Sequence, residues 1–296
     1  MEKRFVVVIL ILVVGISAFY LPKGPFSDEK VLFRVEKGEG SKEIAHNLQN
    51  QGLIWWGPLF RLYSLTSGVS GKLQAGTYKL SPSIDTASLV KKMSRGEVAT
   101  IKLTIPEGFT AKKIQERIKA LTNLEILDLK EREGYLFPDT YLVTYDANAE
   151  EIVQMILDNF YKKTAGLEIT KDIITMASLI EKEVITKEDK EIVSGIFWKR
   201  IDAGLPIESC ATIAYVKEVD QWRYSFEDTR IESPYNTYLN YGLPPGPISN
   251  PGLESILAAI YPQDSQYWYY LSTPEGETIF SRTLEEHNIA KAKYLK

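Results

Sequence analysis

The stretch MASLIEKEVIT, residues 176–186, places a carboxylate in an apolar helical run at the point where the core should continue. The residues seven and four positions before Glu181, and three and four after it, are all apolar: Ile174, Ala177, Val184 and Ile185. Residues at these spacings share one face of a helix. The spacing therefore predicts that Glu181 points inward or into a cleft.

A second glutamate, Glu183, follows two positions later and is rotated by about 200° around the helix. Its neighbours one turn on, Thr186 and Lys187, are polar. We expect Glu183 to meet solvent or a cation.

Two interpretations of Glu181 remain open at this point. A carboxyl group without a partner in apolar surroundings keeps its proton near neutral pH, as a general acid must. A structural carboxylate instead pairs with a basic residue or caps a loop, and such pairs are the commoner case.

Composition and charge limit the function classes. The chain has 296 residues, enough for two domains, and a net charge of -4, which argues against a nucleic-acid partner. It has one cysteine, Cys210, and two histidines, His46 and His287, far apart in the sequence. We therefore expect no disulfide, no metal site, no cofactor and no Ser-His-Asp hydrolase.

The N-terminus carries an uncharged run, FVVVILILVVGISAFYL, over residues 5–21. Its 17 residues approach the length of a membrane-spanning helix, and Lys3 and Arg4 before it favour a cytoplasmic N-terminus at residues 1–4. We predict one anchor in the plasma (inner) membrane, with the rest of the chain on the exported side. A cleaved signal peptide is the alternative.

The rest of the chain predicts an α+β fold. Residues 22–30 are rich in proline, glycine and charge and indicate a tether. Residues 31–100 alternate strand, turn and helix, with Ser41 as a predicted helix cap and Gly52 as a stop. Residues 101–296 predict a mainly helical domain with a small sheet.

The sequence of this second domain predicts several helix caps and turns. Thr110 and Thr186 are expected to start helices, and Thr283 with Glu286 forms a capping box for the last one. Residues 267–281 predict a β-hairpin, and Asn250-Pro251 begins a further helix.

A long loop, ESPYNTYLNYGLPPGPISNPG at residues 232–252, combines tyrosines and short amides on a proline-stiffened backbone. Flat aromatic faces beside amides suit a carbohydrate, whereas a structural loop would pack its tyrosines on the domain. The stretch EGYLFPDTY, residues 133–141, raises the same choice. The candidate substrate-binding residues are Glu133, Tyr141, Tyr235, Asn236, Tyr238 and Asn240.

Several motifs occur together in one order: IPEGFT, EGYLFPDTY, ASLIEKE, then IFWKRI and GLPIES, and finally SPYNTY with GLPPGPISNPG. In this the chain resembles the YceG-like endolytic murein transglycosylases over roughly residues 30–296. The resemblance implies a membrane-anchored lyase that cuts nascent peptidoglycan strands internally, with a LysM-like module near the membrane. It also implies that the acid is the glutamate after ASLI, Glu181. We keep the nearby Glu183 as an alternative acid on its position in the sequence alone.

The chain departs from the family pattern at two places. It has CAT at residues 210–212 where DPT is common, and Thr278 where a histidine is common. We expect Cys210 to fill space as a small apolar residue rather than to act as a nucleophile.

The resemblance implies cleavage of the MurNAc-β-1,4-GlcNAc bond with a 1,6-anhydro end, and a penicillin-binding synthase as a partner. Two rivals stay open. A wall-binding scaffold would leave the chemistry to a partner, and a hydrolytic muramidase would need a second carboxylate, Asp139 or Glu133.

Overall fold

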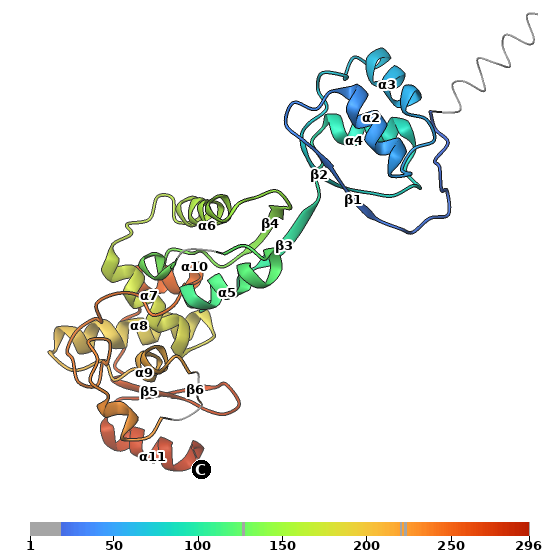
Figure 1. Cartoon of the computed structure of the whole chain (residues 1–296). Coiled ribbons are helices and arrows are strands. Elements are labelled where there is room, and N and C mark those ends of the chain that lie inside the picture. The colour runs from blue at the N-terminus through green and yellow to red at the C-terminus, as the bar shows by residue number, and fades with distance from the viewer. Residues whose placement is uncertain (1–18, 126–127, 220, 222–223, 296) are drawn as a thin grey trace, which may run out of the picture. The chain divides into compact units, whose positions relative to one another are not determined.

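The computed structural model describes residues 19–125, 128–219, 221 and 224–295 (Figure 1). The chain forms two compact units: the first runs to Ile101 and includes Leu142–Ala147, and the second comprises Lys102–Tyr141 and Asn148–Lys296. The division passes through two strands that pair with each other, β3 (Thr100–Thr104) and β4 (Thr140–Thr144).

The first unit is a small α+β module. In chain order it contains β1 (Val31–Val35), α2 (Ser41–Asn50), α3 (Gly57–Thr66), β2 (Gly76–Leu80) and α4 (Thr86–Ser94). The antiparallel strands place Phe33 opposite Tyr78, and both side chains are fully buried. Figure 1 shows the helices gathered on one side of these strands, where Ile44, Leu48 and Phe60 complete the core.

The start of α2 differs from the expectation by one residue. Gly40, not Ser41, is the cap, and its N–H donates to the Glu43 carboxylate at 3.1 Å. Ser41 Oγ instead accepts a hydrogen bond from Ser70 Oγ at 2.9 Å. The predicted stop is confirmed: α2 ends at Asn50, and Gly52 takes a φ of +74° that glycine adopts without strain.

The predicted anchor at residues 5–21 lies almost wholly outside the described residues. Among the residues that are described, no helix is long and apolar enough to cross a membrane. The predicted tether is not a free linker along its length. Gly24 N–H donates to Pro82 O at 2.8 Å, and Ser81 Oγ donates to Ser27 O at 3.1 Å.

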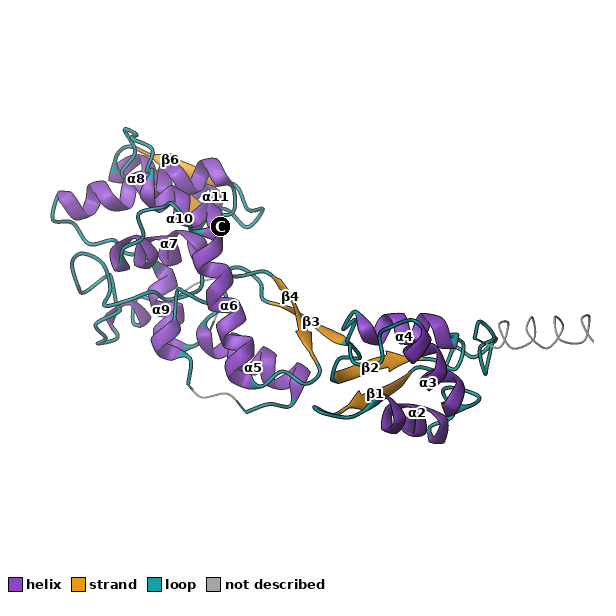
Figure 2. Cartoon of the chain, turned by 90° about the horizontal axis from the view of Figure 1, so that it is seen from above, coloured by secondary structure: helices purple, strands orange, loops and turns teal. Residues whose placement is uncertain are grey.

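The second unit is mainly helical (Figure 2). Its elements are α5 (Ala111–Thr122), η1 (Lys130–Arg132), α6 (Ala149–Lys163), α7 (Lys171–Glu183), α8 (Lys187–Asp202), α9 (Cys210–Lys217), η2 (Asp228–Arg230), α10 (Leu253–Ile260), β5 (Tyr269–Ser272), β6 (Thr278–Ser281) and α11 (Leu284–Tyr294). Helices combined with short antiparallel strands confirm the α+β class.

Helix α7 forms the centre of this unit and packs on α8 and α10. Ile174, Ala177 and Ile180 on its inner face are fully buried. The helix ends at Glu183, because Val184 is extended at φ -142° and ψ 159°. The expected continuation of the apolar stripe is therefore wrong at Ile185, which is 77% exposed.

The predicted threonine caps of the second unit are confirmed, but the Thr283 capping box is not, because the Glu286 carboxylate accepts the N–H of Arg282 at 2.8 Å instead of that of Thr283. The hydroxyls of Thr110, Thr186 and Thr283 each accept a hydrogen bond from the backbone N–H three residues on. The hairpin also forms, with β5 and β6 antiparallel and Tyr270 opposite Phe280. These features depend on short-range geometry, which a sequence pattern reports directly.

Candidate active site

Glu181 lies in the last turn of α7 and points inward, as its helical spacing predicted. Its Oε2 accepts hydrogen bonds from Gly252 N–H at 3.0 Å and from Ser255 Oγ at 2.7 Å, both at the start of α10. The same oxygen lies 3.7 Å from Lys190 Nζ on α8. The Glu181 side chain is 7% exposed and the Lys190 side chain is 4% exposed.

This environment corrects the expectation of an unpaired carboxyl group. A lysine, a backbone N–H and a hydroxyl all approach the same oxygen of this carboxyl group. Through these contacts Glu181 joins α7 to α8 and α10. A second acid lies close by, because burial and Glu181 raise the pKa of Glu107 while Lys190 lowers it.

Glu183, the last residue of α7, is also not where the helical count placed it. Its carboxylate accepts hydrogen bonds from the hydroxyls of Ser209 and Tyr270 and from the N–H of Ala211. The expectation that it meets solvent or a cation is wrong, because the helix ends there and the side chain packs against the start of α9 and strand β5.

Burial raises the pKa of the Glu183 carboxyl above its ordinary value, and the three donors oppose that shift. The neighbouring tyrosines add no charge, since burial raises the pKa of both Tyr238 and Tyr270. Tyr238 Oη lies 3.0 Å from Cys210 Sγ. Cys210 is exposed as a residue, but burial of its sulfur raises the pKa of the thiol, and its expected role as a filler rather than a nucleophile stays a prediction.

A groove of about 670 Å³ lies in this unit between the start of α5, α9 and the tyrosine-rich loop. Its walls include Glu133, Tyr215 and Tyr235. They also include Lys182, which lies between Glu181 and Glu183 in the chain, and Ala211, whose N–H donates to Glu183. The groove therefore passes close to both glutamates, although neither is among the residues that line it.

Glu133 is a second buried carboxyl group in this groove. It accepts the N–H of Ala111, at the start of α5, at 2.9 Å and the Asn250 amide at 2.8 Å. Asn250 also accepts the N–H of Leu136 at 2.8 Å and donates to Phe109 O at 3.0 Å. Glu133 and Asn250 therefore fasten α5 to the loop that precedes α10.

Burial raises the pKa of Glu133 to about 7, while the hydrogen bonds from Ala111 and Asn250 oppose the shift. A carboxyl whose pKa is higher in the folded state stabilises the fold fully below its unfolded pKa, near 4.5, and loses that contribution as pH rises through about 7. We expect the free energy of unfolding of Glu133→Gln to rise by about 3 kcal/mol relative to that of wild type between pH 4.5 and pH 7.5. Urea unfolding of both proteins across this range measures it, and parallel curves would contradict the shift.

The other predicted sugar-binding residues divide into two groups. Tyr235 lines the groove with Glu133, and Tyr238 lies beside Cys210 next to the Glu183 cluster. Asn236 is fully buried and donates to the carbonyls of Thr229 and Ile231 at 3.0 and 2.8 Å.

Tyr141 is 6% exposed, and its hydroxyl donates to Phe137 O at 2.6 Å. Asn240 is exposed, but its amide donates to Ser233 O and Asn236 O, both at 2.9 Å. Tyr141, Asn236 and Asn240 therefore hold the backbone of their own segments. The expectation of a ligand-facing side chain is wrong for Tyr141 and Asn236, since both are buried.

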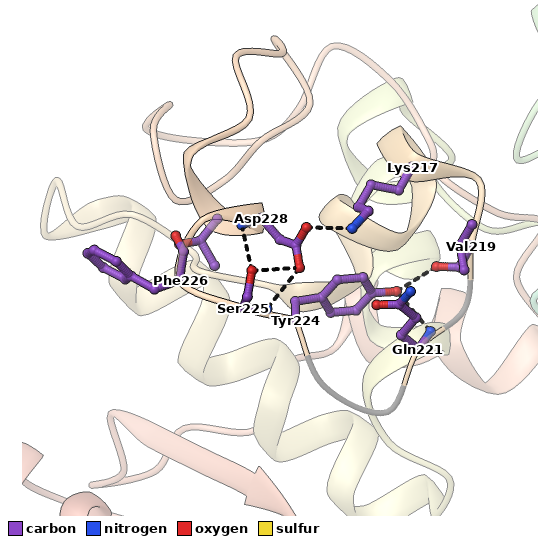
Figure 3. Close-up of polar contacts among 8 residues, drawn as sticks. Lys217, Val219, Gln221, Tyr224, Ser225, Phe226 and Asp228 are labelled. Carbon is purple, nitrogen blue, oxygen red and sulfur yellow. Dashed lines mark hydrogen bonds and ion pairs between the residues drawn. The ribbon is translucent and has the colours of Figure 1, made fainter.

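One end of the groove wall is held by polar contacts after α9 (Figure 3). Lys217 and Asp228 form an ion pair, and Asp228 also accepts the N–H of Ser225 at 2.8 Å. The lysine and serine bonds lower the pKa of Asp228. Tyr224 Oη donates to Val219 O at 2.6 Å. This bond holds Val219, which lines the groove.

Comparison with known proteins agrees with the motif pattern. The model of the YceG-like family matches residues 33–293. The chain belongs to the YceG-like family. The resemblance expected from the motifs is therefore confirmed, and it covers both units.

Two relatives of this YceG-like chain have the same name. The chain is 31% identical to the endolytic murein transglycosylase of Bacillus subtilis, over 91% of this chain and 86% of the relative. It is 28% identical to the endolytic murein transglycosylase of Streptococcus pneumoniae, over 93% of this chain and 60% of that longer protein.

A solved structure is also similar. The crystal structure of a YceG-like protein of Listeria monocytogenes shares 31% identity and a TM-score of 0.58. The match covers 90% of this chain and all of the Listeria chain.

Sequence reasoning missed the partners of the two glutamates in this YceG-like protein. Lys190 contacts Glu181 from α8, and Ser209 and Tyr270 contact Glu183 from segments 26 and 87 residues away. The stretch GLPIESCAT contains Ser209, but a lone serine before a helix indicates only a cap. In this structure the Ser209 side chain caps nothing and serves Glu183 instead.

Proposed function

We propose that this chain is a peptidoglycan lytic transglycosylase that cleaves glycan strands internally, with Glu183 as its general acid and base. Membership of the YceG-like family and the name of the Bacillus subtilis relative support the substrate and the reaction. The observation that carries the choice of residue is the burial of the Glu183 carboxyl beside the donors Ser209, Tyr270 and Ala211, the last of which lines the groove.

Glu183 fits the acid better than Glu181. A general acid must hold a proton before the reaction and still be able to release it. Burial supplies the first property at Glu183, and the donors Ser209, Tyr270 and Ala211 N–H stabilise the carboxylate that remains. Glu181 lies instead against a buried lysine. The sequence-based assignment of the acid to Glu181 remains the alternative.

The proposed reaction needs one carboxyl group and no water. The Glu183 carboxyl gives its proton to the glycosidic oxygen as the bond from C1 of N-acetylmuramic acid breaks. The muramic N-acetyl group meets the positive charge that develops at C1. The carboxylate then takes the proton of the C6 hydroxyl while O6 bonds to C1, which closes the 1,6-anhydro ring and restores the acid.

The contacts of Asp139 disfavour the muramidase alternative. Its carboxylate accepts the N–H of Thr140 at 2.7 Å and the Asn159 amide at 3.0 Å, and these bonds lower its pKa. A carboxylate held between β4 and α6 suits a structural role. Glu133 remains as the second carboxylate that a hydrolytic route would need.

Product masses test the reaction. Purified chain incubated with peptidoglycan strands should release internal fragments with anhydro ends, each one water lighter than the hydrolysed product. Fragments with reducing ends would instead establish a muramidase. Binding of strands without any fragments would establish the scaffold.

We infer that residues 5–21 anchor the chain in the plasma membrane and that both units lie on the exported side. The order β1, α2, α3, β2 supports a LysM-like module that holds glycan near the membrane. Penicillin-binding synthases are the proposed partners, because such enzymes supply nascent strands.

A further inference from the structure

Helix α3 of the first unit has an unusual surface. Its sequence, GPLFRLYSLT, contains a single charged residue, Arg61. Phe60 and Ser64 face the core and are fully buried. The opposite side carries Leu62 and Leu65, which are 51% and 53% exposed. A helix that is apolar on its outer side as well as its inner side is unusual on a soluble surface.

The entry to α3 extends this apolar face. Trp55 and Trp56, directly before the helix, are 63% and 59% exposed. Helical spacing places Pro58, Leu62 and Leu65 in one stripe. We call these five residues the α3 face: Trp55, Trp56, Pro58, Leu62 and Leu65. Exposed tryptophans beside leucines are typical of a membrane–water interface, where an indole keeps its polar N–H near the headgroups.

The end of the apolar N-terminal run is attached to the same helix. The Phe19 and Tyr63 rings lie 5.2 Å apart, and the hydroxyls of Tyr20 and Tyr63 are hydrogen-bonded. Trp55 Nε1 donates to Pro22 O at 3.1 Å. These contacts bring the last residues of the run at 5–21, and the first residue after it, onto α3.

The attachment leaves almost no slack between the run and the helix. Pro22 directly follows the last residue of the run, Leu21, and successive Cα atoms are only about 3.8 Å apart. Where the part of the run before Phe19 crosses a bilayer, α3 lies within a few residues of the point at which the chain leaves it. An exposed apolar surface there can be covered by lipid without any movement of the unit.

We propose that the α3 face lies in the headgroup region of the bilayer and sets the first unit directly on the membrane. This inference rests on the anchor of the proposed function and adds a second contact to it. Interfacial helices bury an apolar side at the boundary between headgroups and acyl chains. Pro58, Leu62 and Leu65 of the α3 face also line a groove between α2 and α3. The rest of that groove carries both signs of charge, including Lys37, Lys42, Glu39 and Glu43, so the proposed contact is with neutral, zwitterionic lipid.

Labels on single cysteines test the position of this face. Full-length chain with Cys210→Ser is inserted into phosphatidylcholine vesicles after Leu62→Cys or Leu65→Cys and coupling to an environment-sensitive fluorophore. The matched control is Leu32→Cys. Leu32 is 47% exposed and points away from the core on β1, where its neighbour Phe33 packs against the helices.

Brominated acyl chains should quench the labels at 62 and 65 by about half or more, and the label at 32 by little. Equal quenching of all three by aqueous iodide, with the chain membrane-bound, would overturn the α3 contact and leave the anchor intact. Failure of the full chain to enter vesicles would overturn both. Shielding of 62 and 65 that disappears on dilution with lipid would assign the face to a second copy, which also overturns the proposal.

Discussion

Glu183→Gln is expected to lower the rate of glycan cleavage by about a thousandfold or more, because general acid–base catalysis by a placed side chain contributes factors of this size. Glutamine retains an acceptor oxygen for Ser209, Tyr270 and Ala211 N–H, but its amide has no acidic proton to transfer to the glycosidic oxygen. Release of anhydro-muropeptides from purified strands, followed by mass spectrometry, measures the rate.

The matched control is Glu181→Gln, made in the same turn of α7. Glu181→Gln leaves the buried Lys190 without its carboxylate, so turnover is compared at equal folded fraction. On that basis it should stay within about tenfold of wild type, since Glu181 contacts the three packed helices and not the substrate. A reversed pattern, with Glu181→Gln inactive and Glu183→Gln active, would restore the acid assigned from the sequence. The wild-type rate should also fall as pH rises through the raised pKa of Glu183, because the acid is then ionised.

Lys190→Met is expected to destabilise the second unit by about 3 kcal/mol, because it leaves the buried Glu181 charge without its cation. Adding Glu181→Gln removes that charge and keeps an acceptor for Gly252 N–H and Ser255. The double variant should therefore return to within about 1 kcal/mol of wild type. Urea unfolding of the three proteins, followed by tryptophan fluorescence, measures both differences.

Lys187→Met serves as the surface control. Lys187 lies 3.8 Å from Glu191 on the same helix, but its side chain is 57% exposed, so its removal should cost less than about 0.5 kcal/mol. A Lys190→Met variant as stable as this control would show that Glu181 is not a buried ion-pair partner. The assignment of a structural role to Glu181 would then fail.

Much of the second unit could be predicted from short-range patterns. The Thr110, Thr186 and Thr283 caps and the β5–β6 hairpin form where expected. The apolar face of α7 is buried as its 3.6-residue period requires. Each of these depends on residues within a few positions of one another, which a sequence displays directly.

The errors at Glu183 and Ile185 share a cause at the end of α7. The helical count runs through Val184 and Ile185, but the chain is already extended at Val184. Glu183 was consequently assigned to solvent, whereas it packs against α9 and β5. Helix ends are set by the balance of local caps and tertiary packing, and the sequence has no strong stop signal here.

The amino-acid sequence by itself determined the family, the order of the elements and the presence of two glutamates in one critical turn. Only the tertiary structure decided how those glutamates differ. Glu181 meets a lysine from α8 and donors 71 and 74 residues away, while Glu183 meets Ser209, Tyr270 and a helix start. The proton affinity of a carboxyl group depends on the charges, donors and water around it, and folding alone brings those groups together.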